Sequence, residues 1–74
     1  MYKWVKYMVI KIKNDYLTLQ QLLKVADLIG SGGEAKLFLF ENKVIINGIE
    51  DNRRGRKLHP GDIVEINGQK YEIA

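Results

Sequence analysis

Two Asn-Gly pairs, at 47–48 and 67–68, restrict the fold of this chain more than any other feature. Asn and Gly both tolerate a positive φ, which the tight turn of a two-residue β-hairpin requires. The flanking segments 43–50 and 63–66 are strand-like, and segment 69–73 alternates between apolar and polar residues, as a strand with one buried face does. A further turn is expected at 59–62, where the sequence is His-Pro-Gly-Asp. The C-terminal half is therefore predicted to form three or four short, mostly antiparallel strands.

An additional strand is expected near the N-terminus, over residues 5–13. Met8, Ile10 and Ile12 alternate there with other residues that include lysines, and this period of two is typical of a strand with one buried face. The sequence Asn-Asp-Tyr at 14–16 then interrupts the pattern. The sheet is therefore expected to receive an extra strand from the beginning of the chain.

Two short helices are predicted between this strand and the hairpins. Thr18 and Gln21 have the spacing of a capping box for a first helix, which is expected to end at Gly30. Ser31 and Glu34 repeat the same signal for a second helix. The apolar residues that share one face are Leu19, Leu22, Leu23 and Ala26 in the first helix and Ala35, Phe38 and Leu39 in the second. Such faces must be buried, so the predicted fold is α+β, with both helices packed on one face of the small sheet.

A chain of 74 residues has room for one domain, and we expect residues 1–74 to fold as a single domain. There is no cysteine, so neither disulfides nor a thiolate metal site support the small core. Residues 1–13 are apolar, but lysines interrupt them and no small-residue cleavage site follows, which argues against a signal peptide. No apolar run approaches the roughly 20 residues that a membrane-spanning helix needs. We therefore expect a cytoplasmic protein without a membrane partner.

The excess positive charge of the chain is local. The net charge is +3, and residues 51–61 account for all of it with four cations and one acid. The cations are Arg53, Arg54, Arg56 and Lys57, and no arginine occurs elsewhere in the chain. Because the planar guanidinium group binds phosphate oxygens in pairs, this cluster favours nucleic acid as the partner. A solvated loop, an acidic protein and an anionic membrane are the alternatives that charge alone leaves open.

Two glycines stand at the expected start of the second helix, although glycine is a poor helix former. Gly32 and Gly33 lack β-carbons, so a phosphate could lie directly on the free amide groups of the first turn. An equally good explanation is a tight corner or close packing between the two helices. Lys36 adds a cation close to the same turn.

Catalytic chemistry finds little support in the sequence. The chain has one histidine, one serine and one threonine, and Ser31 and Thr18 are already explained as helix caps. His59 alone cannot form a metal site. We therefore expect no enzymatic activity, no catalytic residue, no metal and no cofactor. The aromatic residues Tyr2, Trp4, Tyr7, Tyr16 and Tyr71 could stack on bases, but packing is the more common use of aromatic side chains on short strands.

Five segments between Thr18 and Ile66 together resemble the S4 domain, a small RNA-binding domain named after the fourth protein of the small ribosomal subunit. The segments are TLQQLLK, SGGEAK, VIINGIE, RRGRKL and GDIV. The pair SGGEAK and RRGRKL is similar to the compact, stand-alone members of this family called YaaA-like. In this family two helices and a small sheet form a surface for structured RNA, which implies a core RNA-binding motif over about 18–66. By this resemblance and the analysis of the residues, the predicted RNA-binding residues are Ser31, Gly32, Gly33, Lys36, Arg53, Arg54, Arg56 and Lys57.

The family usually carries an arginine after the cap serine, where this chain has Gly32, so backbone amides are expected to replace that side chain. The resulting hypothesis is a monomeric, non-catalytic module that binds structured, ribosomal RNA through its phosphate backbone, in ribosome assembly or translation. The alternative is a protein-protein adaptor whose basic loop contacts an acidic partner.

Overall fold

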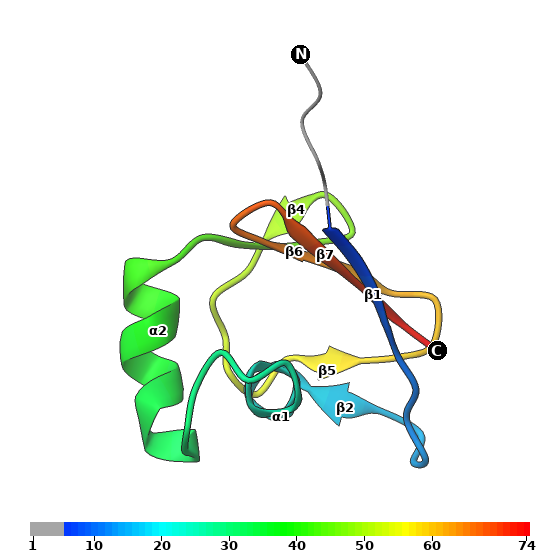
Figure 1. Ribbon diagram of the computed structural model, residues 1–74, viewed down its shortest axis with the longest axis horizontal. Helices are drawn as coiled ribbons and strands as arrows, with labels where there is room; N and C mark the ends of the chain where they lie inside the picture. The colour runs from blue at the N-terminus through cyan, green and yellow to red at the C-terminus, as the bar shows by residue number, and fades with distance from the viewer. Residues whose placement is uncertain (1–5) are drawn as a thin grey trace.

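The computed structural model describes residues 6–74 and has an α+β architecture, as predicted. Within these residues, a five-stranded sheet has the order β1-β7-β6-β3-β4, and a second sheet pairs β2 with β5. Figure 1 shows the larger sheet on one side of the molecule, α1 and the smaller sheet on the other, and α2 at one end. The elements are β1 (Lys6–Ile10), β2 (Leu17–Thr18), α1 (Leu19–Val25), the 3₁₀ turn η1 (Gly32–Glu34), α2 (Ala35–Glu41), β3 (Val44–Ile46), β4 (Ile49–Glu50), β5 (Lys57–Leu58), β6 (Ile63–Ile66) and β7 (Gln69–Ile73).

Both predicted hairpins are confirmed. Asn47 and Gly48 have φ values of 51° and 84°, and they join β3 to β4 in antiparallel register. Asn67 and Gly68, with φ values of 49° and 82°, join β6 to β7 in the same way. Two successive positive φ values are those of a type I′ turn, which matches the twist of the paired strands. The local chemistry of these four residues therefore determines the register of two of the four strand pairs in the larger sheet.

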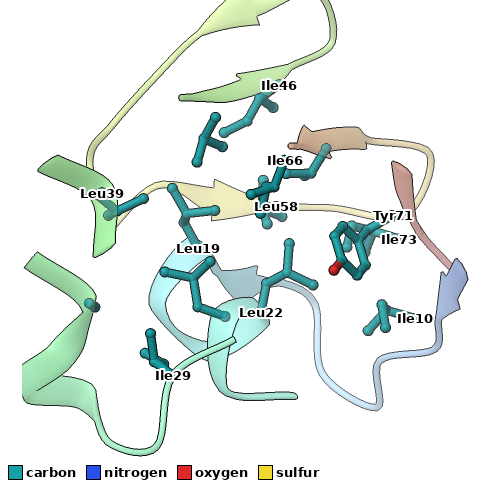
Figure 2. Packing of buried hydrophobic residues seen from close by; sticks show 14 residues of the cluster. Ile10, Leu19, Leu22, Ile29, Leu39, Ile46, Leu58, Ile66, Tyr71 and Ile73 are labelled. Carbon is teal, nitrogen blue, oxygen red and sulfur yellow. The ribbon is translucent and has the colours of Figure 1, made fainter. Parts of the chain in front are cut away.

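The first strand, β1, pairs in parallel with β7 at the edge of the sheet. It is shorter than the predicted 5–13, since it ends at Ile10; Val5 lies outside the described residues. The predicted buried face is only partly correct, because Ile10 is buried and Ile12 half-buried but Met8 is exposed. Figure 2 shows Ile10 at the margin of the core cluster, and Tyr7, Met8 and Val9 before it are exposed.

Helix α1 begins with the predicted capping box. Gln21 N donates to Thr18 Oγ1 over 3.2 Å, and Thr18 N donates to Gln21 Oε1 over 2.8 Å. The predicted end at Gly30 is wrong, because the helix ends at Val25 and Asp27 takes the left-handed conformation with φ 60°. The turn that follows carries Ile29 back into the core, where it is buried. Burial of apolar residues beyond the helix, a tertiary effect, thus ends the helix early.

The second helix starts differently from the prediction. Residues Gly32–Glu34 form the 3₁₀ turn η1, and the Ser31 side chain makes no capping hydrogen bond. Glu34 Oε2 instead accepts a hydrogen bond from Gly30 N at 2.8 Å, so the predicted Ser31-Glu34 capping box is wrong. The apolar face of α2 is confirmed: Ala35 and Leu39 are buried and Phe38 is half-buried against the core.

The core lies between the two layers of the described residues. Figure 2 shows Leu19 and Leu22 of α1 facing Ile46, Ile66 and Tyr71 of the larger sheet. The buried residues are Ile10, Leu19, Leu22, Leu23, Ile29, Ala35, Leu39, Val44, Ile46, Leu58, Val64, Ile66, Tyr71 and Ile73. Burial raises the pKa of the Tyr71 phenol. These residues come from every part of the described chain, so the helices and both sheets share one core.

Two short strands were not predicted. Leu17–Thr18 (β2) and Lys57–Leu58 (β5) pair in antiparallel register, so five strands rather than three or four follow the helices in the described chain. Leu58 is completely buried between the layers. The predicted turn at 59–62 is confirmed, since Asp62 N donates to His59 O and Asp62 Oδ2 accepts from His59 N. Among residues 6–74, no helix has the length and apolar character needed to cross a membrane.

Candidate nucleic-acid interface

The basic segment is the connection between β4 and β5, and its backbone is attached to the start of α1. Leu19 N donates to Arg56 O over 2.8 Å, and Gln20 N donates to Arg54 O over 2.9 Å. These two amides belong to the first turn of α1, which has no carbonyl partners inside the helix. Arg56 N closes a tight turn by donating to Arg53 O over 3.0 Å. The basic loop is therefore held in one conformation by a helix of the core.

Two of the three arginines bind the same internal carboxylate. Asp51 Oδ2 lies 2.8 Å from Arg53 Nη2 and 2.9 Å from Arg56 Nη1, and its side chain is only 7% exposed. The hydrogen bonds from the Arg53 side chain, then those from its backbone and from Arg56, outweigh burial and hold the pKa of Asp51 well below its usual range. The same contact raises the pKa of Arg53. Asp51 is therefore charged at neutral pH and orients both guanidinium groups.

Arg54 points to a different place, a groove between the basic loop and α2. This open groove has a volume of about 630 Å³. In Figure 1 the loop passes from β4 to β5 beside α2. Arg54 and Lys36 both line the groove, and neither has a carboxylate within ion-pair distance among residues 6–74. The lining residues are Gly33, Lys36, Leu37, Leu39, Phe40, Asn52 and Arg54.

Lys57 lies on the other side of the loop. A second, smaller concavity is lined by Arg53, Gly55, Arg56 and Lys57. Lys57 Nζ lies 4.9 Å from the centre of the Tyr16 ring, a distance at which a cation is attracted to the π face. The structure thus divides the predicted cations into two sets. Arg54 and Lys36 share the groove, whereas Arg53, Arg56 and Lys57 surround the second concavity.

The glycines before α2 have separate environments. A β-carbon on Gly32 would lie 2.6 Å from Gln20 Nε2, the end of a flexible side chain that can move away, so this contact by itself does not require glycine. Gly33 has no such close neighbour, since the nearest atom to a β-carbon there would be Ser31 Oγ, at 3.9 Å. Gly33 also lines the groove, so its backbone is open to a ligand. Ser31 is exposed next to this turn. The roles of these residues in RNA binding stay predictions.

The outer face of the larger sheet has the opposite character. Ile45 faces outward and is paired with Glu50 on one side and Glu65 on the other. Glu65 is in turn paired with Lys70, and Glu72 lies on the same face opposite Ile63. This face therefore carries three carboxylates, which would repel phosphate. Tyr7 Oη at the edge donates a hydrogen bond to Glu72 Oε1.

Sequence reasoning missed Leu37, Phe40 and Asn52 as residues of the groove. A signal for two of them was present, since Leu37 and Phe40 are apolar residues outside the stripe of Ala35 and Leu39 and lie three positions apart. Their meeting with Arg54 depends on the path of the basic loop, which periodicity does not reveal.

The other residues considered for chemistry have ordinary positions. Hydrogen bonds from His59 N and the Asn47 side chain lower the pKa of Asp62, although burial alone would raise it. Tyr71 packs in the core, as expected of strand aromatics, whereas Tyr7 and Tyr16 are exposed. Tyr2 and Trp4 lie outside the described residues. Within 6–74, no group of three or more potential ligands is placed to hold a metal ion.

Comparisons with known proteins agree with the fold. A family model described as S4 domain matches residues 10–74, a wider range than the predicted motif at about 18–66. A protein of Bacillus subtilis (strain 168) named "Probable ribosome maturation protein RlbA" is 58% identical over 59 residues. The alignment covers 80% of this chain and 83% of that protein.

Proposed function

This chain belongs to the S4 domain family, and from that premise we propose that it is a non-catalytic RNA-binding module of ribosome biogenesis. The observation that carries this proposal is the meeting of Arg54 and Lys36 in one groove. The two residues come from separate elements, and neither has a carboxylate partner within 6–74. Two unpaired cations on an open surface favour an anionic ligand from outside the chain.

RNA is the anion that fits this arrangement best. The ion pairs to Asp51 hold Arg53 and Arg56 in fixed orientations, which lowers the conformational entropy lost when they bind phosphate. Arg53, Arg54 and Arg56 belong to one loop, and Lys36 lines the groove beside that loop. Such a cluster of cations suits a phosphate backbone, and A-form RNA is recognised largely through its shape and backbone. The contacts proposed are those of Ser31, Gly32, Gly33, Lys36, Arg53, Arg54, Arg56 and Lys57.

The RNA proposed is structured ribosomal RNA, bound during maturation of a ribosomal subunit. The relative named as a probable ribosome maturation protein supports this, because it is 58% identical over most of both chains. The family match supports a role without catalysis. We further propose that the chain acts in the cytoplasm as a monomer, with residues 1–74 as one domain.

Binding to purified ribosomal subunits over a salt series tests the proposal. If about four phosphates are neutralised, log affinity should fall against log salt with a slope of roughly −3 to −4. The double variant Lys36→Gln with Arg54→Gln should bind on the order of tenfold more weakly and with a flatter slope. Lys43→Gln with Lys70→Gln is the matched control, because it removes the same charge beside Glu65 on the outer sheet face.

Equal effects of the two double variants would contradict a localised site, and a salt-independent affinity would contradict the electrostatic mechanism. The main alternative is an adaptor whose arginines contact an acidic protein. Such a complex would survive nuclease treatment in a pull-down experiment. An RNA-dependent association with ribosomal particles would be lost.

A further inference from the structure

Two large apolar side chains are exposed on α2 without a role in the core. Phe40 is 86% exposed and Leu37 is 61% exposed. The stripe that packs inward consists of Ala35, Phe38 and Leu39, so these two residues form a second apolar surface on the same helix. Contiguous apolar surface on a small protein commonly marks a binding site.

The surroundings of Phe40 and Leu37 indicate which kind of ligand they contact. Both line the groove that also contains Arg54 and Lys36, and no acidic residue lines it. Ile49 is also highly exposed, at 71%, but does not line the groove. An aromatic face beside free cations is the combination that binds a nucleotide, because the base stacks on the ring while the phosphate pairs with a cation. A purely apolar protein segment would leave both cations unpaired.

We propose that this groove binds an unpaired nucleotide of the RNA, with its base on Phe40 and Leu37 and its phosphate at Arg54 and Lys36. The inference rests on the proposed function and adds a substrate class to it: RNA with a bulged, looped or single-stranded nucleotide next to the bound helix. Fully paired RNA has no base free to enter the groove, and proteins commonly recognise RNA at such unpaired positions.

The test compares two short strands by fluorescence anisotropy at low salt. One is an oligoadenylate RNA, and the other is an abasic strand with the same number of phosphates. The wild-type chain should bind the oligoadenylate on the order of tenfold more tightly, since the bases are the only groups in which the two strands differ. Phe40→Ala should bind both strands with the same, weaker affinity, whereas Phe40→Tyr should keep the preference. Ile49→Ala, a change at another highly exposed apolar residue that lies outside the groove, should behave as the wild type.

Three outcomes would overturn the inference. The wild type could bind both strands equally, or Phe40→Ala could retain the preference for bases. Phe40→Ala could also weaken subunit binding although the wild type does not distinguish the strands, which would assign the apolar surface to a protein partner. In each case the proposed function stands if Lys36→Gln with Arg54→Gln still weakens binding to ribosomal subunits. A wild-type chain that binds neither strand nor any ribosomal subunit would overturn both proposals.

Discussion

At the scale of single residues, the carboxylate of Asp51 decides how the arginines are used. It accepts hydrogen bonds from Arg53 and Arg56, while Arg54, between them, is directed to the groove beside α2. A basic loop of three free arginines would repel itself and sample many conformations. One nearly buried acid removes part of this repulsion and holds two side chains in place.

We expect Asp51→Asn to lower the free energy of unfolding at neutral pH by roughly 1 to 2 kcal/mol, because charge-assisted hydrogen bonds are lost. The pKa of Asp51 is lower in the folded chain than its ordinary value of 3.8. Its stabilising contribution is therefore complete above that value and is lost as the pH falls through the lower folded pKa. Urea unfolding should show a difference between wild type and variant that is full at neutral pH and shrinks in strong acid.

Asp15→Asn is the control for this experiment, since it makes the same charge change at an exposed residue without an ion pair in the described chain. It should leave stability nearly unchanged. A difference between wild type and Asp51→Asn that stays constant down to strong acid would show that the Asp51 charge does not stabilise the loop.

At the scale of elements, the start of each helix serves the basic surface in a different way. The first two amides of α1 hold the loop through Arg56 O and Arg54 O, so they are occupied. The turn η1 before α2 instead leaves Gly33 open on the groove. The two adjacent glycines therefore have different surroundings. Gly32 lies against the Gln20 side chain, whereas Gly33 lines the groove.

The substitution Gly33→Ala should change stability and subunit binding in opposite directions. The φ angle of Gly33 is outside the left-handed region and its side-chain position is free of close contacts, so alanine should raise the free energy of unfolding by about 0.5 to 1 kcal/mol. If a phosphate lies on this backbone, the added methyl group should weaken binding to ribosomal subunits severalfold. Thermal unfolding and the subunit titration measure the two effects. Unchanged affinity would exclude backbone contact at Gly33.

At the scale of the whole molecule, the basic loop is attached directly to the core. Leu19 donates its amide to the basic loop and places its side chain in the core, and Leu58 extends the same loop into the buried layer. The carboxylates on the outer sheet face would repel phosphate, so the proposed RNA contacts lie away from that face. A small domain with one shared core is expected to unfold cooperatively.

We therefore expect a single unfolding transition. The midpoint from far-ultraviolet circular dichroism, which reports on the helices, should coincide with that from near-ultraviolet circular dichroism, which reports on the packing of aromatic side chains such as the buried Tyr71 of the sheet. Loss of subunit binding on heating should follow the same curve. Two separate midpoints would show that the helices and the sheet are independent units and would contradict the single-domain proposal.

Local interactions explain most of what could be predicted from the sequence. The positive φ of Asn47 and Asn67, the Thr18-Gln21 capping box and the inward stripe of α2 each depend on residues at most four positions apart. Such interactions are readable as spacing, because propensity and periodicity act within a turn or two. The basic cluster and Lys36 were named from their residue type, their position and the family resemblance, and their role in RNA binding stays a prediction.

Contacts between residues distant in sequence determine the features that could not be predicted. The end of α1 at Val25, followed by the buried Ile29, and the pairing of β2 with β5 depend on burial against residues distant in sequence, which outweighs local signals. The same holds for the groove, where Arg54 meets Phe40 and Lys36 only because the loop is fixed to α1. Whether an exposed side chain faces solvent or a shared groove depends on which segments pack side by side. Packing is a property of the whole chain, so no short stretch of sequence contains it.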